Sequence, residues 1–316
     1  MHLMCMDYIF LATYQPNALH SLANAGQACQ YSNSLHPTAK SARYDSNLTT
    51  PRLEKSRSQR IVWLLEECSK NTSYSVEVYK RMSSKLAPPE LKAVHPLGKS
   101  PLVTIAAPSL SEPIVLAESA AICEYLCDHF APHLIPTRWR EGCEGKVGGE
   151  TEQWLRYRFY MHYAEGSFMS LLTVAMFMSS EFSPFEPSLP SSHPDILIIK
   201  LDIRDSPVPF FIKPVTRGIA DKVDNVYLNE NFATHFGFLE SQLASSPDNG
   251  EYLCGASLTA ADILMSFPII AVIDKVDATK HPKLKAYAAK IKAHEGNVGA
   301  IKKIEELTGM PYELRP

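Results

Sequence analysis

Regular spacing of hydrophobic residues begins only near residue 56 of this chain. From there Ile61, Val62, Leu64 and Leu65 recur at helical spacing, while residues 74–80 alternate as a half-buried strand does. In order, the pattern predicts a helix opening near Ser56, a strand over 74–80, a short helix from Pro89 to about Val94, strands over 100–108 and 113–119, and a helix from Ser119 to about Phe130.

This order of elements is typical of an α/β thioredoxin-like domain, in which a parallel βα unit precedes a hairpin and a closing helix. Such a sheet needs one more strand before Ser56 to complete its first crossover. The only candidate is the stretch 48–55, LTTPRLEK, which contains Pro51. That strand would be central, where proline removes a hydrogen bond from the ladder. We therefore expect a thioredoxin-like domain over 48–133 whose first strand is impaired.

The rest of the chain is mostly helical in pattern and predicts an all-α bundle over 146–309. Residues 151–178 carry apolar side chains all round, as a central bundle helix does. A Pro/Ser-rich stretch then breaks the pattern. We interpret 181–202 as an atypical insertion and the Ser- and Asn-rich residues 1–47 as a poorly ordered leader, and we predict that both pack poorly.

Composition narrows the class of protein. With 316 residues, 45% of them hydrophobic and 21% charged, the chain resembles an ordinary soluble globular protein. A net charge of −3 without a basic run argues against a nucleic-acid partner. No membrane span or secretory signal is predicted, because no segment is long and apolar enough and the N-terminal stretch lacks a basic region. A cytoplasmic location fits best.

The seven cysteines lack a C-x-x-C pair, so neither a disulfide framework nor a zinc site is predicted, and no metal is expected. Cys123 and Cys127 stand four apart on one face of a predicted helix. We interpret this pair as small, buried, apolar residues.

Two segments of the first domain carry candidate chemistry for a peptide with a thiol. Ser56 stands where a helix opens, and unpaired N–H groups and the positive dipole end would stabilise a thiolate there. The alternative is that Ser56 or Ser58 only caps the helix. Before the next strand, a cis peptide at Pro101 would let the main chain of Ser100 pair with a peptide ligand, with Lys99 near a carboxylate. The alternative is an ordinary turn.

A third segment, Glu118-Ser119, precedes another helix. The free N–H groups of that helix and the Ser119 hydroxyl would hold a carboxylate, and Glu118 would hold an ammonium group beside it. The alternative is a capped helix with a surface glutamate. Glutathione has an amino group and a carboxylate on one carbon, a peptide bond and a thiol, so it matches all three segments.

The stretches SRSQRIVWLLEE, ELKAVHPLGKSPLVTI and VLAESAAICEYL resemble the N-terminal domain of cytosolic glutathione transferases in order and spacing, nearest to the fungal, yeast-type and theta-like serine branch. The resemblance covers about 53–307 apart from the insertion. It implies a catalytic role for Ser56, a cis proline at Pro101, and glutathione contacts at the following residues: Lys99, Ser100, Glu118 and Ser119.

Two features of the second domain complete the comparison. Thr259 and Asp262 are spaced as a capping box. Glutathione transferases have the same box at this place, and we interpret it as structural. The electrophile pocket should be lined by the long helix, with candidates Tyr160, His162, Tyr163, Phe168 and Met169. Such aromatic and methionine stripes are more often core residues than pocket walls.

The resemblance implies an enzyme that conjugates the thiolate of glutathione, its co-substrate, to hydrophobic electrophiles in detoxification, and that forms a homodimer. Glutathione-dependent peroxide reduction is an alternative that uses the same thiolate. A non-catalytic glutathione-binding or regulatory module is another, and a chain that fails to fold is a third. Disulfide exchange is disfavoured, because it requires a cysteine where Ser56 stands.

Overall fold

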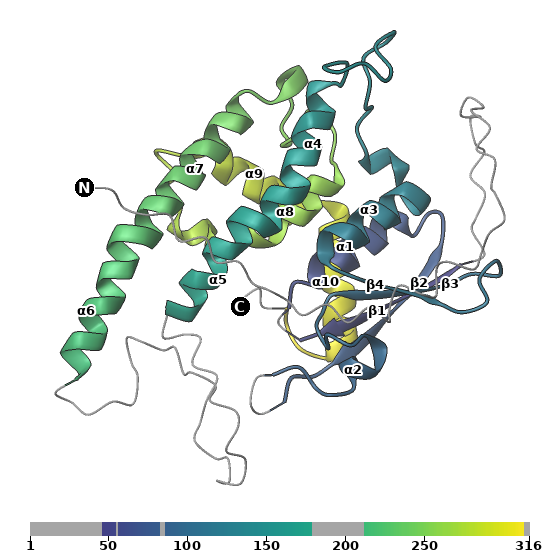
Figure 1. Cartoon of the computed structure of the whole chain (residues 1–316), viewed down its shortest axis with the longest axis horizontal. Coiled ribbons are helices and arrows are strands. Elements are labelled where there is room, and N and C mark those ends of the chain that lie inside the picture. Colours follow the sequence, from purple (N-terminus) through teal and green to yellow (C-terminus); the bar gives the residue numbers. More distant parts are fainter. Residues whose placement is uncertain (1–45, 55, 83–85, 179–211, 313–316) are drawn as a thin grey trace. The chain divides into compact units, whose positions relative to one another are not determined.

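The computed structural model describes residues 46–54, 56–82, 86–178 and 212–312 (Figure 1). Of the predicted leader, only Ser46 and Asn47 fall within these ranges. The predicted insertion at 181–202 lies outside the described residues. The expectation that both stretches pack poorly therefore stays a prediction.

A four-stranded sheet forms the first part of the structure. Its strands are β1 (Asn47–Leu53), β2 (Ser73–Tyr79), β3 (Leu102–Ala106) and β4 (Ile114–Ala117), and its helices are α1 (Gln59–Cys68), α2 (Leu91–Val94) and α3 (Ser119–Phe130). The strand order is β2-β1-β3-β4, with β1 and β2 parallel and the other pairs antiparallel. Helices α1 and α3 cover one face, and α2 lies on the other (Figure 1). The predicted thioredoxin-like fold is confirmed.

Side chains on the two faces of β1 belong to two different hydrophobic clusters. Leu48 packs into the large core with Ile61 and Leu65 of α1, whereas Leu53 packs with Leu91 of α2 on the opposite side of the sheet. Helix α1 is buried on nearly all sides, because the sheet lies under it and helices of the second part pack over it. This burial explains why apolar residues fill almost every turn of its sequence.

Pro51 lies inside the central strand after all. β1 pairs with β2 along its full length, but its pairing with β3 ends at Thr49, two residues before the proline. Beyond that point side chains replace the ladder: Thr50 Oγ1 donates to the carbonyl of Leu102 at 2.9 Å, and Ser100 Oγ donates to the Pro51 carbonyl at 3.2 Å. The strand thus tolerates proline because the lost ladder bonds are confined to one side.

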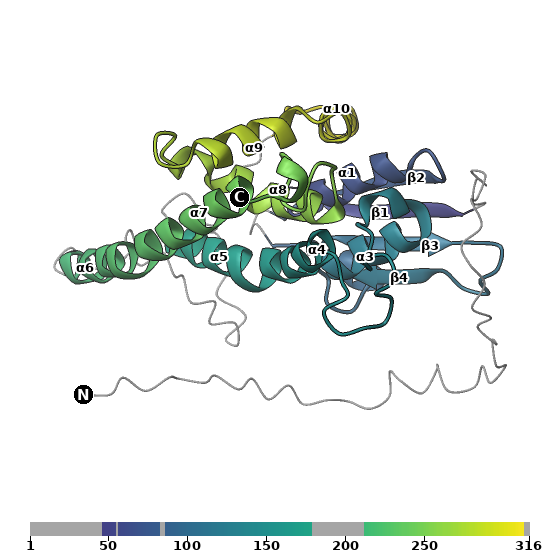
Figure 2. The same ribbon diagram turned by 90° about the horizontal axis from the view of Figure 1, so that it is seen from above.

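The second part is helical. It consists of α4 (Glu152–Tyr163), η4 (Ala164–Phe168), α5 (Met169–Met178), α6 (Lys213–Val223), η6 (Asp224–Leu228), α7 (Asn229–Ala244), α8 (Ala260–Val272), α9 (Pro282–Ala293) and α10 (Glu295–Thr308), with short 3-10 turns η3 (Pro132–Leu134), η7 (Pro247–Asn249) and η8 (Ile273–Lys275). The π-helical turns η4 and η6 each continue directly into a flanking helix, so 152–178 and 213–244 are two long helices. Helix α8 lies between α4 and α9 (Figure 2).

The predicted capping box is present at the start of α8. The Asp262 carboxylate accepts hydrogen bonds from Thr259 N at 2.9 Å, Thr259 Oγ1 at 2.7 Å, Leu253 N at 3.0 Å and Tyr287 Oη at 2.9 Å. Asp262 has no exposed surface. Four donors from three segments therefore converge on one buried carboxylate, which makes the box a tertiary anchor as well as a helix cap.

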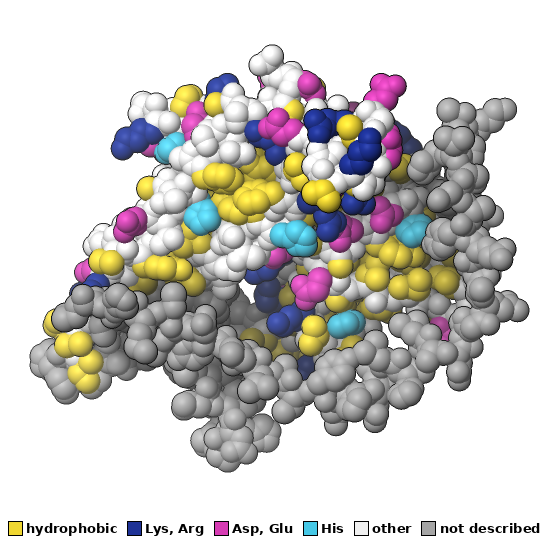
Figure 3. All heavy atoms as spheres, turned by 45° about the horizontal axis from the view of Figure 1, so that its top comes forward, with side chains coloured by type: hydrophobic (Ala, Val, Ile, Leu, Met, Phe, Trp, Pro, Cys, Tyr) yellow, Lys and Arg dark blue, Asp and Glu magenta, His cyan; other side chains and the backbone are white. Residues whose placement is uncertain are grey.

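Acidic, basic and hydrophobic side chains are interspersed on the face that Figure 3 displays. Large exposed hydrophobic side chains include Leu155 and Phe159 on α4 and Val215 on α6. Within the described ranges, no helix combines the length and the hydrophobicity needed to cross a bilayer.

Candidate functional site

Ser56 lies in the turn that leads from β1 into α1. Its Oγ donates to the Leu53 carbonyl at 2.6 Å, stands 2.6 Å from Ser58 Oγ, and accepts from Ser58 N at 3.3 Å. Ser58 is buried at the N-cap position but makes no side-chain cap bond. Ile61 N and Val62 N both donate to the Ser58 carbonyl at 3.0 and 3.1 Å, so the N–H groups before Ile61 lie at the open end of the helix.

The loop before β3 reaches the same place. The Ser100–Pro101 peptide is cis, as the sequence predicted, and Pro101 is buried while Lys99 is exposed. Ser100 Oγ accepts a hydrogen bond from Leu53 N at 3.3 Å. The cis-proline loop is therefore held directly against the end of β1, from which the Ser56 turn departs.

The start of α3 completes the set. Glu118 is exposed and has φ 70° and ψ 120°, a conformation that a non-glycine residue rarely adopts. Ser119 begins the helix and is buried. The first helical bond runs from Ile122 N to the Glu118 carbonyl, which leaves the N–H groups of the first turn without helical partners. This end of α3 can accept an anion.

Strand register explains why the three segments meet. β3 is antiparallel to β1, so its beginning lies beside the end of β1. β4 is antiparallel to β3, and Ala117 at its end pairs with Leu102 at the start of β3. The turn before α1, the cis-proline loop and the start of α3 therefore share one edge of the sheet.

Sequence reasoning missed two residues that tie this edge together, Arg60 and Glu165. Arg60 is fully buried, and its guanidinium donates to Ser119 Oγ at 3.2 Å and to the Leu264 carbonyl at 2.7 Å. It also binds Glu165 Oε1, while Glu165 Oε2 accepts from Arg57 Nη1 at 2.7 Å. The available signal was an arginine beside the apolar residues of α1 and a glutamate in the middle of a long helix rich in apolar residues.

The predicted electrophile-pocket residues lie along α4. Tyr160 is fully buried, and its Oη has no hydrogen-bond partner among the residues that the structure describes. Tyr163 is nearly buried, and its hydroxyl contacts His235 Nδ1. His162 is exposed, whereas Phe168 and Met169 are buried. The role of these side chains in binding stays a prediction.

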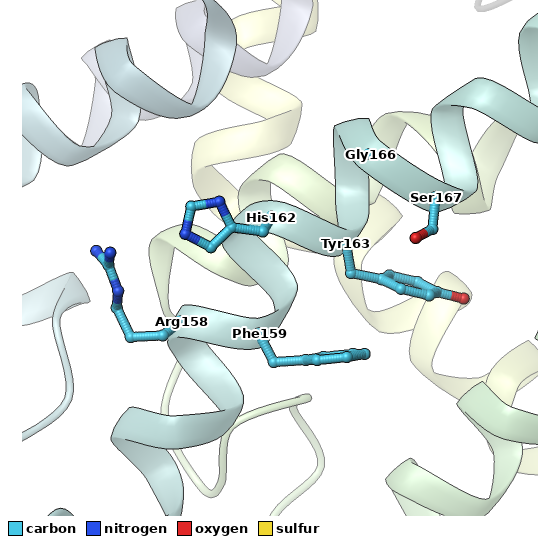
Figure 4. Close-up of a pocket in the computed structure, with 6 residues that line it drawn as sticks. All are labelled: Arg158, Phe159, His162, Tyr163, Gly166 and Ser167. Atoms are coloured by element: carbon cyan, nitrogen blue, oxygen red, sulfur yellow. The ribbon is translucent and has the colours of Figure 1, made fainter. Parts of the chain in front are cut away.

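A hollow of about 560 Å³ opens beside two of these residues (Figure 4). Its lining is Arg158, Phe159, His162, Tyr163, Gly166 and Ser167. The rings of Phe159 and Tyr163 stack with their centroids 5.2 Å apart, and both side chains point the same way. His162 points to the other side of the helix. The contacts of Arg57, by contrast, run to Glu165 and to Thr173 of α5 at 3.4 Å. Glu165 and Thr173 thus contact Arg57 next to Ser56, and the predicted Phe168 and Met169 lie between them in the sequence.

Cys123 and Cys127 have no exposed surface, as the sequence interpretation expected. Burial raises the pKa of the Cys123 thiol to about 12, although the nearby Arg60 opposes that shift. Burial likewise holds the pKa of Cys127 well above its usual value. Neither thiol is suited to act as a nucleophile.

Comparisons with known proteins identify the family. The family model of the glutathione S-transferase N-terminal domain matches residues 56–129, and that of the C-terminal domain matches 202–303. Glutathione S-transferase 3 of Schizosaccharomyces pombe is 30% identical over 219 residues, which cover 69% of this chain and 72% of that protein. The chain belongs to the glutathione S-transferase family.

A second relative agrees with this assignment, and a solved structure has the same fold. Glutathione S-transferase 1 of Saccharomyces cerevisiae is 29% identical over 258 residues, covering 81% of this chain and 94% of that transferase. The crystal structure of a glutathione S-transferase from Actinobacillus pleuropneumoniae is 24% identical, covers 84% of this chain and 95% of its own, and superposes with a TM-score of 0.53. The match to the N-terminal family model begins at Ser56, so β1 with its Pro51 lies outside the residues that this model covers.

Proposed function

We propose that this transferase binds glutathione at the shared edge of the sheet and conjugates its thiolate to hydrophobic electrophiles. One observation carries the proposal: three segments suited to a thiolate, a peptide and an amino-acid end converge there through strand register. The names of the relatives support glutathione as the co-substrate. Assignment to the serine branch rests on Ser56 and belongs to the same proposal.

In this proposal each segment holds one part of glutathione. The main chain of Ser100 beside Pro101 pairs with the cysteinyl unit, and Lys99 meets the glycyl carboxylate. Glu118 holds the ammonium group, and Ser119 with the free N–H groups of α3 holds the γ-glutamyl carboxylate.

The chemical step follows from placement of the thiol at the start of α1. The helix end and the Ser56 hydroxyl stabilise the thiolate, so the thiol proton is released to solvent at neutral pH. The sulfur then attacks the electrophilic carbon, and with a chlorinated aromatic the carbon–chlorine bond breaks and chloride leaves. Holding both reactants in one cleft lowers the entropic part of the barrier.

The electrophile is proposed to lie against the long helix, and the predicted contacts at Tyr160, His162 and Tyr163 belong to this proposal. His162→Ala tests it most simply, because that side chain is exposed and beside the hollow. A raised KM for the electrophile with an unchanged KM for glutathione would support it. Unchanged values for both would favour a pocket near Thr173, which contacts Arg57 next to Ser56.

A conjugation assay tests the function itself. The full chain should release chloride from a chlorinated aromatic at a rate that saturates with glutathione. Retention on immobilised glutathione without turnover would show the binding module instead. Reduction of an organic hydroperoxide without conjugation would favour the peroxidase alternative.

We also propose that the transferase is a cytoplasmic homodimer whose glutathione sites lie near the interface. Light scattering after size exclusion tests the assembly, and a mass near twice 35.2 kDa is the expected result. A mass of one chain would contradict it. Fractionation of cells of the source organism tests the location.

A further inference from the structure

Arg60 has an unusual environment for a charged side chain. It is fully buried, and its guanidinium contacts residues of three separate elements: Ser119 of α3, Leu264 of α8 and Glu165 of η4. Burial lowers the pKa of the Arg60 guanidinium, and the adjacent Glu165 carboxylate opposes that shift. A buried guanidinium without such a partner would be strongly destabilising, so Glu165 is what allows Arg60 to stay charged beside Ser119.

The contact between Arg60 and Ser119 determines the hydrogen-bonding role of the Ser119 hydroxyl. A guanidinium can only donate hydrogen bonds, so the Ser119 oxygen is the acceptor in the 3.2 Å contact. The Ser119 hydroxyl proton is consequently left for another acceptor. At the start of α3, where helical N–H groups are also free, the natural acceptor is an incoming carboxylate.

The net charge of Arg57, Arg60 and Glu165 also favours a carboxylate ligand at this place. Glu165 supplies one negative charge to two guanidinium groups, those of Arg57 and Arg60. The cluster therefore keeps one net positive charge between the start of α1 and the start of α3. Glu165 contacts both arginines from the π-helical turn η4, and such turns often occur at functional sites.

We propose that Glu165 is a positioning residue for glutathione, acting through Arg60 to orient Ser119 toward the γ-glutamyl carboxylate. The inference rests on the proposed function, because it presumes that glutathione binds at this edge of the sheet. Glu165 itself need not touch the ligand. It joins the helical part of the chain to the amino-acid end of the site.

Glu165→Gln tests this role, since it keeps the shape of the side chain and removes its charge. We expect the Kd for glutathione to rise about tenfold, the change that one charge-assisted hydrogen bond produces, with kcat at saturating glutathione within about twofold. Cysteinylglycine lacks the γ-glutamyl unit, so its KM as thiol donor should be the same in both proteins. Glu165→Asp keeps the charge and should recover part of the glutathione affinity.

A double-mutant cycle separates positioning from general loosening. Because Glu165 acts through Ser119, Glu165→Gln should add less than twofold to the Kd of Ser119→Ala. Glu251→Gln is the matched control: it removes a carboxylate that pairs with Lys290 in the helical part, and its glutathione Kd should equal that of the wild type. If Glu165→Gln does not fold, Glu165→Asp replaces it. Because Glu165→Asp recovers only part of the affinity, its Kd for glutathione should still exceed that of the wild type, while its KM for cysteinylglycine should be unchanged.

Equal losses for glutathione and cysteinylglycine would overturn the inference, as would additive effects in the cycle. An unchanged Kd for glutathione in Glu165→Gln would also overturn the inference. In that case the proposed function would still hold, because the wild-type protein binds glutathione. A wild-type protein that binds no glutathione would remove the proposed function, and this inference with it.

Discussion

The hydroxyl of Ser56 donates its hydrogen bond to the carbonyl of Leu53, with 2.6 Å between the two oxygens. The residue proposed to stabilise a thiolate thus points its proton back at the end of β1. To serve a sulfur, the hydroxyl must rotate away from Leu53 when glutathione binds. The Oγ of Ser58 lies 2.6 Å from that of Ser56, so it can stay hydrogen-bonded to the Ser56 hydroxyl while that hydroxyl rotates.

Replacement of Ser56 by alanine should lower turnover more than glutathione affinity. A hydrogen bond to a charged group contributes roughly 1.5–3 kcal/mol, so kcat should fall about 10- to 100-fold. Steady-state kinetics with varied glutathione measures both effects. Unaltered kcat would assign the stabilisation to Ser58 or to the end of α1 alone, and Ser58→Ala decides between these two.

Ser100→Ala should destabilise the folded protein beyond any effect on ligand binding. The Ser100 hydroxyl bridges the Pro51 carbonyl and Leu53 N where β1 no longer pairs with β3. Its loss should cost about 1–3 kcal/mol in the free energy of unfolding, measured by urea titration without glutathione. Thr49→Ala, which removes an exposed bond to Ser75, is the control and should cost less than about 0.5 kcal/mol. Equal costs would show that the bridge is not what supports the proline strand.

Much of this architecture could be predicted from periodicity, and the exceptions have a common cause. The helix with Ile61 and Leu65, the strands and the capping box at Thr259 follow from patterns within about ten residues. Pro51 was expected to impair its strand, yet the strand forms because it pairs with β2 along its full length and because distant groups bond to it, such as Ser100, 49 residues away. Local sequence does not encode such partners.

The same limit applies to the candidate site. The three segments were found because each has a local signature at a helix or strand end. The pairing of Arg60 with Glu165 spans 105 residues, and it depends on a π-helical turn that no periodicity indicates.

Asp262→Ala should be strongly destabilising, because four buried donors would lose their acceptor at once. We expect a loss of about 3 kcal/mol or more in the free energy of unfolding. Asp277→Ala is the matched control, since Asp277 caps Thr279 N and Oγ1 in the same manner but at the surface. That substitution should cost about 1 kcal/mol or less. Similar costs for the two would contradict the role of Asp262 as a tertiary anchor.

His235 should make stability depend on pH. Burial lowers its pKa below the usual value, so between the two values the unfolded chain binds more protons than the folded one. Stability from this group is therefore present above about pH 6.5 and declines as the pH falls toward the lowered folded-state pKa. Protonation at Nδ1 would also remove the acceptor of the Tyr163 hydroxyl. The fall in Tm from pH 7.5 to 5.5 should be smaller in His235→Gln than in the wild type. The same fall in both would rule out His235 as its source.

The central claim is that the start of α1 ionises the thiol of glutathione. Titration of the thiolate absorbance of glutathione bound to the full chain, against free glutathione, measures this directly. We expect the bound thiol to ionise about two pH units below the free one, with part of that shift lost in Ser56→Ala. A bound thiol that titrates like free glutathione would contradict the account.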